Sequence, residues 1–560
     1  MLVRKPLRPA EARAADPRSP PSVRRPKGPA WLRHAVFYEI YPQSFLDTNG
    51  DGIGDLPGII RKLDYIASLG CNAIWINPCW LSPFGDAGYD VADFCRVAPR
   101  YGTNADLRRL FREARRRGLR VCLDLVAGHT SVEHPWFKAS AQPGKNPQTN
   151  WYVWNSSVWE DVPDLATVQG FSARDGRYVA NFFHFQPALN FGFARPDPRK
   201  PWQLPVDHPD VLRVRAEMKR IMRYWLDAGA DGFRVDMASS LVKRDPGYQQ
   251  TMAWWREVRA MCDRDYPDAA LISEWSSPRH AIAAGFHVDF LIHFNGLAYT
   301  TLFRHERSRD IFGVRARYGH SFFDRSGRGS VAEFLRTYLR HYRLTRRTGY
   351  ISIPSGNHDI GRLSEGRTVA ELKVIFTFLL TLPGVPCIYY GDEIGLRHVH
   401  GLPSKEGGYG RTGARTPMQW TGGRNAGFST GSRHRLYLPI DPKAGRPTVE
   451  TQLNDPESLL HHVRRLLRLR AESPALGGDE DFLPLGATSR YRPLVYLRRK
   501  GAERFLVAIN PARTEHELLL RIRTKSVAGC VGSGVSVEIS GSGLRLRMRG
   551  VSHGVFRLIP

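Results

Sequence analysis

Eight short runs of apolar, largely β-branched residues recur along the chain, and amphipathic stretches of helical period separate them. A run that is apolar at every position is typical of a parallel strand buried on both faces. Strands that alternate with helices predict βαβ units, and eight such units predict a closed (β/α)8 TIM barrel. The expected strands are residues 35–41, 73–77, 120–124, 232–236, 271–274, 288–292, 350–353 and 386–390.

The third and fourth predicted strands are separated by about a hundred residues, far more than a βα loop needs. This insert is rich in tryptophan, tyrosine and phenylalanine, so it has apolar material for a small core of its own. We therefore expect a separate domain B over residues 130–205, inserted after strand 3. The barrel would comprise residues 31–129 and 206–480.

Both ends of the chain depart from the barrel pattern. After about residue 480 the apolar positions form short alternating runs, which predict an antiparallel β-sandwich over residues 481–560. Residues 1–30 are rich in proline, arginine and alanine and have little periodicity. We expect a disordered basic extension there, because such a composition buries little apolar surface.

Four of the predicted strands run into a carboxylate or a histidine. These segments are Asp-Leu-Val-Ala-Gly-His at 124–129, Gly-Phe-Arg-Val-Asp at 232–236, Ile-Ser-Glu-Trp at 272–275 and Gly-Asn-His-Asp at 356–359. In a βα barrel the C-terminal strand ends converge on one face, where catalytic side chains lie. Several carboxylates and a histidine on that face suit acid, base and nucleophilic work on a sugar acetal.

In content and order, these four segments resemble the signature regions of the α-amylase family of retaining glycoside hydrolases (family 13). The resemblance covers roughly residues 31–560. It implies Asp236 as the nucleophile, Glu274 as the general acid/base and Asp359 as a stabiliser of the transition state. Arg234 lies two residues before Asp236 on the same face of the strand, so its guanidinium is expected to keep that carboxylate ionised.

The same resemblance implies which residues bind the sugar. His129 and His358 are similar to the histidine pair that hydrogen-bonds the hydroxyls of the glucose being cleaved. Tyr89, Asp90 and Arg362 resemble residues that grip the same terminal glucose. In exo-acting relatives such contacts close the pocket, so short substrates are expected.

Residues 47–55 read Asp-Thr-Asn-Gly-Asp-Gly-Ile-Gly-Asp and form an oxygen-rich loop suited to Ca²⁺ or Mg²⁺. The loop lacks the glutamate that closes an EF-hand, and relatives that act on oligosaccharides carry a similar loop. We expect a structural Ca²⁺ ion, with Mg²⁺ as an alternative; a polar turn without metal is the other interpretation. The implied ligands are Asp47, Asn49, Asp51, the carbonyl of Ile53 and Asp55.

Two further stretches resemble the group that contains oligo-1,6-glucosidases, trehalose synthases and sucrose isomerases. They are Gly-Ala-Arg-Thr-Pro-Met-Gln-Trp at 413–420 and Gln-Pro-Ala-Leu-Asn at 186–190. Three departures leave the linkage open. Ala188 replaces the usual aspartate, Gly128 stands where relatives usually carry asparagine, and Met237 follows the nucleophile in place of valine or alanine.

The formal net charge of +27 is densest at the two ends of the chain. Residues 1–30 carry eight lysines and arginines against two acidic residues, and residues 482–560 carry fourteen against four. The excess is therefore away from the chemistry, and we interpret it as solvated arginine, with binding to an anionic surface or polymer as the alternative. We expect no nucleic-acid partner.

Cysteine usage and hydropathy indicate the compartment. The seven cysteines are scattered, odd in number and without a Cys-x-x-Cys pair, which favours free thiols in a reducing cytoplasm. No run of eighteen apolar residues occurs and the first residues have no apolar stretch, so we expect neither a membrane span nor a secretory signal.

The leading hypothesis is a retaining α-glycosidase that acts on short α-glucosides through a covalent glycosyl-enzyme. Hydrolysis, disaccharide isomerisation of the trehalose synthase type and glucosyl transfer share the first half-reaction, and the sequence leaves them open. A hypothesis of another class is a non-catalytic, amylase-like scaffold or carbohydrate-binding protein. The sequence predicts no oligomeric state.

Overall fold

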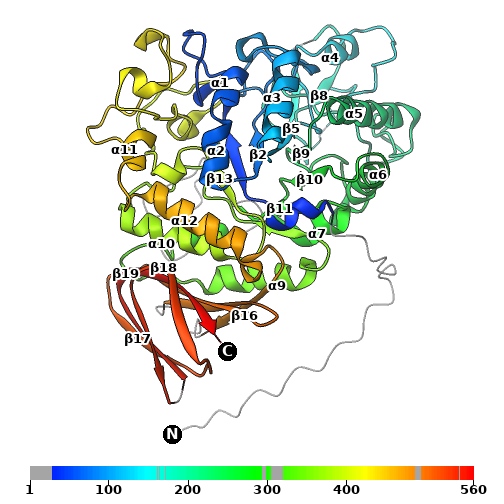
Figure 1. Ribbon diagram of the computed structural model, residues 1–560. Coiled ribbons are helices and arrows are strands. Elements are labelled where there is room, and N and C mark those ends of the chain that lie inside the picture. Colours follow the sequence, from blue (N-terminus) through cyan, green and yellow to red (C-terminus); the bar gives the residue numbers. More distant parts are fainter. Residues whose placement is uncertain are drawn as a thin grey trace, which may run out of the picture.

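The computed structural model describes residues 28–292 except 161, 163 and 171, residues 298–303, residues 320–485, and residues 493–559 except 542. Most of the extension expected over residues 1–30 therefore lies outside the described residues. Figure 1 shows a barrel ringed by helices, with an antiparallel sheet, coloured orange to red, packed against one side.

Eight parallel strands form the barrel, in the order β12-β11-β10-β9-β5-β2-β1-β13. A parallel bridge between Pro354 and Cys387 joins the two ends of this order, so the sheet closes on itself. The TIM barrel predicted from the sequence is confirmed. The strands are β1 (Phe37–Ile40), β2 (Ala73–Ile76), β5 (Arg120–Leu125), β9 (Gly232–Val235), β10 (Ala270–Ser273), β11 (Val288–Phe290), β12 (Tyr350–Ser352) and β13 (Cys387–Tyr389).

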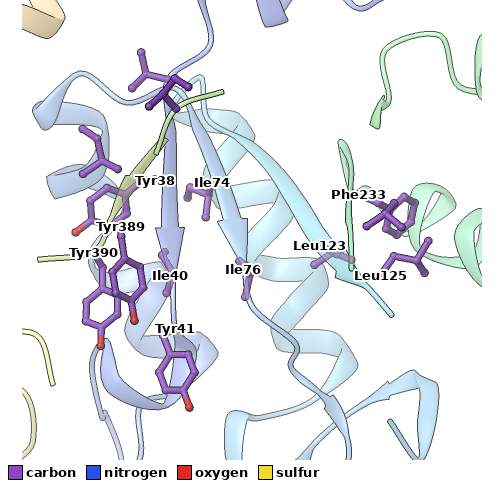
Figure 2. Packing of buried hydrophobic residues seen from close by; sticks show 14 of the residues in the cluster. Tyr38, Ile40, Tyr41, Ile74, Ile76, Leu123, Leu125, Phe233, Tyr389 and Tyr390 are labelled. Atoms are coloured by element: carbon purple, nitrogen blue, oxygen red, sulfur yellow. The ribbon is translucent and has the colours of Figure 1, made fainter. Parts of the chain in front are cut away.

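Alternate residues of each strand face two different cores, which explains why apolar residues occupy both sets of alternating positions. Ile40, Ile74 and Ile76 belong to the large core between the strands and the helices. Figure 2 shows these side chains projecting from the neighbouring strands β1 and β2. Trp75 and Cys122, which are out of phase with them, pack in a second cluster inside the barrel.

The helices cover the outside of the barrel and begin at recognisable caps. In α3 (Asn104–Arg116), Thr103 and Asp106 form a capping box, and the buried face carries Leu107 and Phe111 at helical spacing. The other helices of the barrel are α1 (Leu56–Arg61), α2 (Leu63–Leu69), α5 (Pro209–Asp227), α6 (Gln249–Asp265), α7 (Pro278–Ala284), α8 (Ala298–Phe303), α9 (Ala332–Thr345), α10 (Val369–Thr381), α11 (Val449–Leu453) and α12 (Leu459–Glu472).

The insert between β5 and β9 forms the small domain B. It holds α4 (Pro135–Ser140) and a three-stranded sheet of β6 (Trp154–Asn155), β7 (Thr167–Gln169) and β8 (Arg177–Val179). Its chain then returns to the barrel through a bridge between Ala188 and His129, and Leu189 N–H donates to the carbonyl of Gly128 at 3.0 Å. Ala188 is fully buried in the domain's own apolar cluster, so a methyl group suits this position.

The C-terminal strands form one antiparallel sheet that folds over on itself. The long β19 (Gly543–Ile559) pairs with β17 (His516–Leu520) through its first half and with β16 (Glu503–Asn510) through its second. Leu546 and Leu506 then pack in one cluster between the two halves, as in a sandwich. The remaining strands are β14 (Asp481–Leu485), β15 (Leu494–Lys500) and β18 (Ser526–Ser540). Near the mouth of the barrel, β3 (Trp80–Leu81) pairs with β4 (Asp93–Val97).

All seven cysteines carry free thiols, and most of them are buried. Among the helices that the structure describes, none has the length and apolar character needed to cross a membrane.

Candidate active site

Polar residues lie at the C-terminal ends of several barrel strands and point into the barrel. Side chains two positions apart on a strand lie on the same face, so the residues two positions after the inward-facing Trp75 and Cys122 also point inward. The inward polar residues on five strand ends are Glu39, Asn77, Asp124, Asp236 and Glu274, and all of them are buried. The barrel therefore gathers side chains from distant parts of the sequence at one face.

A single buried guanidinium holds three of the carboxylates. Arg234 Nη1 lies 3.0 Å from Asp124 Oδ1 and 3.1 Å from Asp236 Oδ1, and Nη2 lies 2.7 Å from Glu274 Oε1. Asp124 Oδ2 also accepts hydrogen bonds from Trp75 Nε1 at 3.0 Å and Tyr89 Oη at 2.9 Å. The guanidinium thus fixes the carboxyl groups of Asp236 and Glu274 relative to each other.

Burial and the neighbouring charges of this cluster shift the pKa of Asp236. Burial raises the pKa of Asp236 well above its usual range, the neighbouring Glu274 adds to the rise, and Arg234 opposes it. The rise opposes the ionised state that the sequence predicts for Asp236, because the attraction of Arg234 does not offset burial and the neighbouring Glu274. Two neighbouring carboxyl groups are the arrangement that a retaining glycosidase needs.

The backbone beside Asp236 takes part in the same cluster. Met237 adopts the left-handed region with φ +41°, which is uncommon for a residue with a side chain. Met237 N–H donates a hydrogen bond to Glu274 Oε2 at 3.0 Å. The two strand ends are therefore linked by a main-chain hydrogen bond as well as through Arg234.

Asp359 occupies a second, cationic cluster. Its Oδ1 accepts from Arg411 Nη1 at 2.5 Å and from Arg415 Nη2 at 3.3 Å, and its Oδ2 lies 3.3 Å from His358 Nε2. Burial opposes ionisation, but His358, Arg411 and Arg415 together hold the pKa of Asp359 well below its usual range. These neighbours therefore favour the ionised form of Asp359.

Tyr89 and His358 connect the two clusters. Their rings stack with centroids 5.2 Å apart and an interplanar angle of 12°. His358 Nδ1 lies 3.0 Å from both Glu39 Oε1 and Asn77 Nδ2, while Tyr89 Oη donates to Asp124. His129 joins this group because its Nε2 lies 3.1 Å from the carbonyl oxygen of Tyr89. Three of the predicted sugar-binding residues are thus together.

Asp90 and Arg362 are both buried, and each is bonded to residues outside this group. The carboxylate of Asp90 accepts from Ser82 Oγ at 2.9 Å, Asp86 N at 3.0 Å and Gly85 N at 2.8 Å, which braces its own loop. Arg362 forms a fully buried ion pair with Asp392 at 3.1 Å. Asp90 and Arg362 could therefore contact a sugar, as predicted from the sequence, only while keeping these protein partners.

Asp86 and Arg411 are two further candidates that the sequence reasoning missed. Asp86 Oδ2 accepts from Gln186 Nε2 at 2.9 Å, and its Oδ1 lies 3.8 Å from Arg411 Nη2, while Arg411 Nη1 bonds Asp359. Burial raises the pKa of Asp86 to about 6, against the pull of Arg411. The signals were present, because Asp86 lies three residues before Tyr89 and Arg411 lies just before the recognised 413–420 stretch.

The oxygen-rich loop folds around its own backbone. Asp47 accepts from the N–H groups of Asn49, Gly50 and Gly52, and Asp51 accepts from Ile53 N–H at 2.8 Å. Asp55 caps α1 by accepting from Gly58 N–H at 2.7 Å and also binds Thr48. Across the described residues, no group of three or more His, Cys, Asp or Glu side chains meets in a metal-binding arrangement. All candidate ligand atoms of the loop are nevertheless oxygens, which is the ligand type that Ca²⁺ prefers.

The catalytic-domain model of the α-amylase family matches residues 39–479. The chain belongs to the α-amylase family. An oligo-1,6-glucosidase of Parageobacillus thermoglucosidasius is 30% identical over 539 residues, covering 86% of this chain and 90% of that protein. The trehalose synthase/amylase TreS of Mycobacterium tuberculosis is 34% identical over 522 residues, covering 85% of this chain and 81% of its own.

Solved structures of the family have the same architecture. The trehalulose synthase MutB of Pseudomonas mesoacidophila superposes with a TM-score of 0.78 at 25% identity, covering 95% of this chain and all of that one. The α-glucosyl transfer enzyme XgtA gives a TM-score of 0.75 at 28% identity, covering 94% of this chain and 99% of its own. The similar proteins are thus glycoside hydrolases and transglycosylases, and this chain is an enzyme of that class.

Proposed function

We propose that this enzyme cleaves short α-glucosides with retention, by double displacement through a covalent glycosyl-enzyme. The observation that carries the proposal is the contact of one buried guanidinium with both Asp236 and Glu274. An α-glucoside seated there has a nucleophile on one side of the anomeric carbon and a proton donor at the leaving oxygen. Asp359, whose pKa is lowered by the cations around it, supplies negative charge for the oxocarbenium-like transition state.

Asp236 and Glu274 together account for every bond and proton transfer in the two steps. Asp236 bonds the anomeric carbon as the glycosidic C–O bond breaks, and Glu274 gives its proton to the leaving oxygen. An incoming hydroxyl then gives its proton back to Glu274 while its oxygen displaces Asp236 from the anomeric carbon. Water as the acceptor gives hydrolysis, whereas a sugar hydroxyl gives an isomerised or transferred product.

Residues that could grip a terminal glucose support the proposed preference for short substrates. Asp86 and Arg411 face one another beside Asp359, and opposite charges of this kind hydrogen-bond sugar hydroxyls well. His129, His358 and Tyr89 complete this set as predicted from the sequence. In this proposal Asp90 and Arg362 support the pocket from behind, through the loop at 82–90 and the ion pair with Asp392.

Two more parts of the function are proposals from local chemistry. Seven free thiols support work in a reducing compartment, the cytoplasm. The loop at residues 47–55 is proposed to hold one structural Ca²⁺, with Mg²⁺ as the alternative, through the oxygens of Asp47, Asn49, Asp51, Ile53 and Asp55. A bound ion would neutralise the carboxylates there and fix the start of α1.

The second candidate function is disaccharide isomerisation of the trehalose synthase type. The 34% identity to trehalose synthase/amylase TreS favours it. It differs from hydrolysis only in the acceptor. The deciding experiment is product analysis after incubation with maltose, isomaltose, sucrose and trehalose separately. Glucose release shows hydrolysis, and a rearranged disaccharide at constant total disaccharide shows isomerisation; no reaction with any of them would refute both.

Asp236→Asn and Glu274→Gln are each expected to lower kcat by at least about a thousandfold, because each removes a group that forms or breaks a bond. Both substitutions preserve shape, so the thermal melting curve should change little. Trapping of a glucosyl-enzyme by mass spectrometry with a fluorinated glucoside should succeed only with Asp236 intact. More than a few per cent of residual activity in either variant would refute its assigned role.

Asp86→Asn should raise KM about tenfold or more with a smaller change in kcat, because a charged hydrogen bond to the substrate is lost. Asp90→Asn is the matched control: its carboxylate braces the loop, so it should lower the melting temperature more than it changes KM. Steady-state kinetics and differential scanning calorimetry of both variants decide between them. The reverse pattern would return the sugar contact to Asp90.

Amylose should be attacked far more slowly than maltose at equal weight, because a pocket closed beyond the terminal glucose admits only chain ends. Viscosity should stay nearly constant while glucose or a rearranged disaccharide accumulates. A rapid fall in viscosity with mixed mid-length products would show cutting inside the chain and would contradict this expectation.

Chelation by EDTA should lower the melting temperature by several degrees, because an ion that binds only the folded state stabilises it by mass action. Added Ca²⁺ should restore the original value, and elemental analysis of undialysed protein should show about one ion per chain. Asp51→Asn should weaken the restoration. Unchanged melting together with no Ca²⁺ or Mg²⁺ in the protein would make residues 47–55 a polar turn only.

A further inference from the structure

The chain has no side chain at position 128, and an asparagine from domain B fills the space. Asn181 Nδ2 lies 3.1 Å from His129 Nδ1. A Cβ atom added to Gly128 would approach Asn181 Nδ2 to 2.9 Å. A side chain at 128 would therefore displace the Asn181 amide from His129, so the two positions compete for one place beside the histidine.

The hydrogen bonds of His129 define its tautomer. The amide of Asn181 can only donate through Nδ2, so Nδ1 of the ring must accept and carries no proton. The proton of the neutral ring is then on Nε2, which donates to the carbonyl oxygen of Tyr89 at 3.1 Å. Burial lowers the pKa of His129 to about 3, so the ring stays neutral.

Asn181 is itself oriented by a cation. Lys243 Nζ, which can only donate, lies 3.3 Å from Asn181 Oδ1 and also donates to the carbonyl of Ser240 at 2.8 Å. This contact turns the oxygen of the amide toward Lys243 and its nitrogen toward His129. The same nitrogen lies 3.9 Å from the sulfur of Met237, the residue after the nucleophile.

We propose that Asn181 is a positioning residue, which takes the place of a side chain at 128 and fixes the ring of His129 against Tyr89 at the edge of the sugar pocket. Domain B thereby sets the orientation of a sugar-binding group on the barrel. The proposal rests on the proposed function, because its measurable consequence is the turnover of an α-glucoside.

The test is a reciprocal pair of substitutions, assayed on whichever of maltose, isomaltose, sucrose or trehalose the wild-type enzyme turns over fastest. Asn181→Ala should lower kcat/KM about tenfold, mainly through KM, because His129 loses the hydrogen bond that orients its ring. Gly128→Asn alone should also lower kcat/KM, because its side chain displaces Asn181. In the double variant kcat/KM should recover to within about threefold of the wild-type value, because the amide introduced at position 128 can occupy the space beside His129 that the removed Asn181 side chain filled.

Asn146→Ala is the matched control. Asn146 also lies in domain B and donates its amide to the Ala139 carbonyl at 2.8 Å, and it is expected to leave kcat/KM unchanged. Melting curves of all variants separate a loss of folding from a loss of positioning. If Gly128→Asn fails to fold, Gly128→Ala, which adds only the competing Cβ, replaces it, and the KM effect of Asn181→Ala carries the test.

Two outcomes would overturn the proposal. One is an Asn181→Ala variant with unchanged KM and kcat. The other is a double variant whose loss equals the product of the two single losses, since independent sites add in free energy. If the wild-type enzyme is active, either result refutes the positioning role of Asn181 but leaves the proposed function standing. A wild-type enzyme without turnover on all four sugars refutes the proposed function instead.

Discussion

The structure of the site depends on one buried cation. Arg234 is almost inaccessible to solvent, and its guanidinium contacts Asp124, Asp236 and Glu274 from three different strands. A buried charge is tolerated only where partners surround it, and each carboxylate needs the guanidinium for the same reason. The strand ends of β5, β9 and β10 must therefore meet around this group, and the register of the barrel determines whether they do.

The second half of the site has the opposite balance of charge. Asp359 is one carboxylate among His358, Arg411 and Arg415, whereas Arg234 is one cation among three carboxylates. The pKa of Asp236 is raised in the first cluster, whereas the pKa of Asp359 is lowered in the second. Two aspartates of one site therefore have opposite pKa shifts because their surroundings differ.

The barrel and its loops contribute differently. Asp124, Asp236 and Glu274 lie in or directly after the strands β5, β9 and β10, so the closed sheet fixes their positions. Asp359, Asp86 and Arg411 lie in loops, and domain B supplies Gln186, which binds Asp86, and Asn181, which binds His129. Because loops vary more readily than a closed sheet, relatives with one chemistry can differ in the sugar that they hold and in the acceptor that they admit.

The sequence by itself determined the barrel and the family. Strands buried on both faces carry apolar residues at both sets of alternating positions, and a residue two positions beyond an inward-facing one, such as Asp236 or Glu274, also points inward. The tertiary structure alone decided the partners of residues on loops. Asp90 and Asp86 are four residues apart in one loop, and only the fold shows that one braces the backbone while the other faces Arg411. Likewise, the empty side-chain position at Gly128 is visible in the sequence, but its filling by Asn181 depends on how domain B returns to the barrel, which no local pattern encodes.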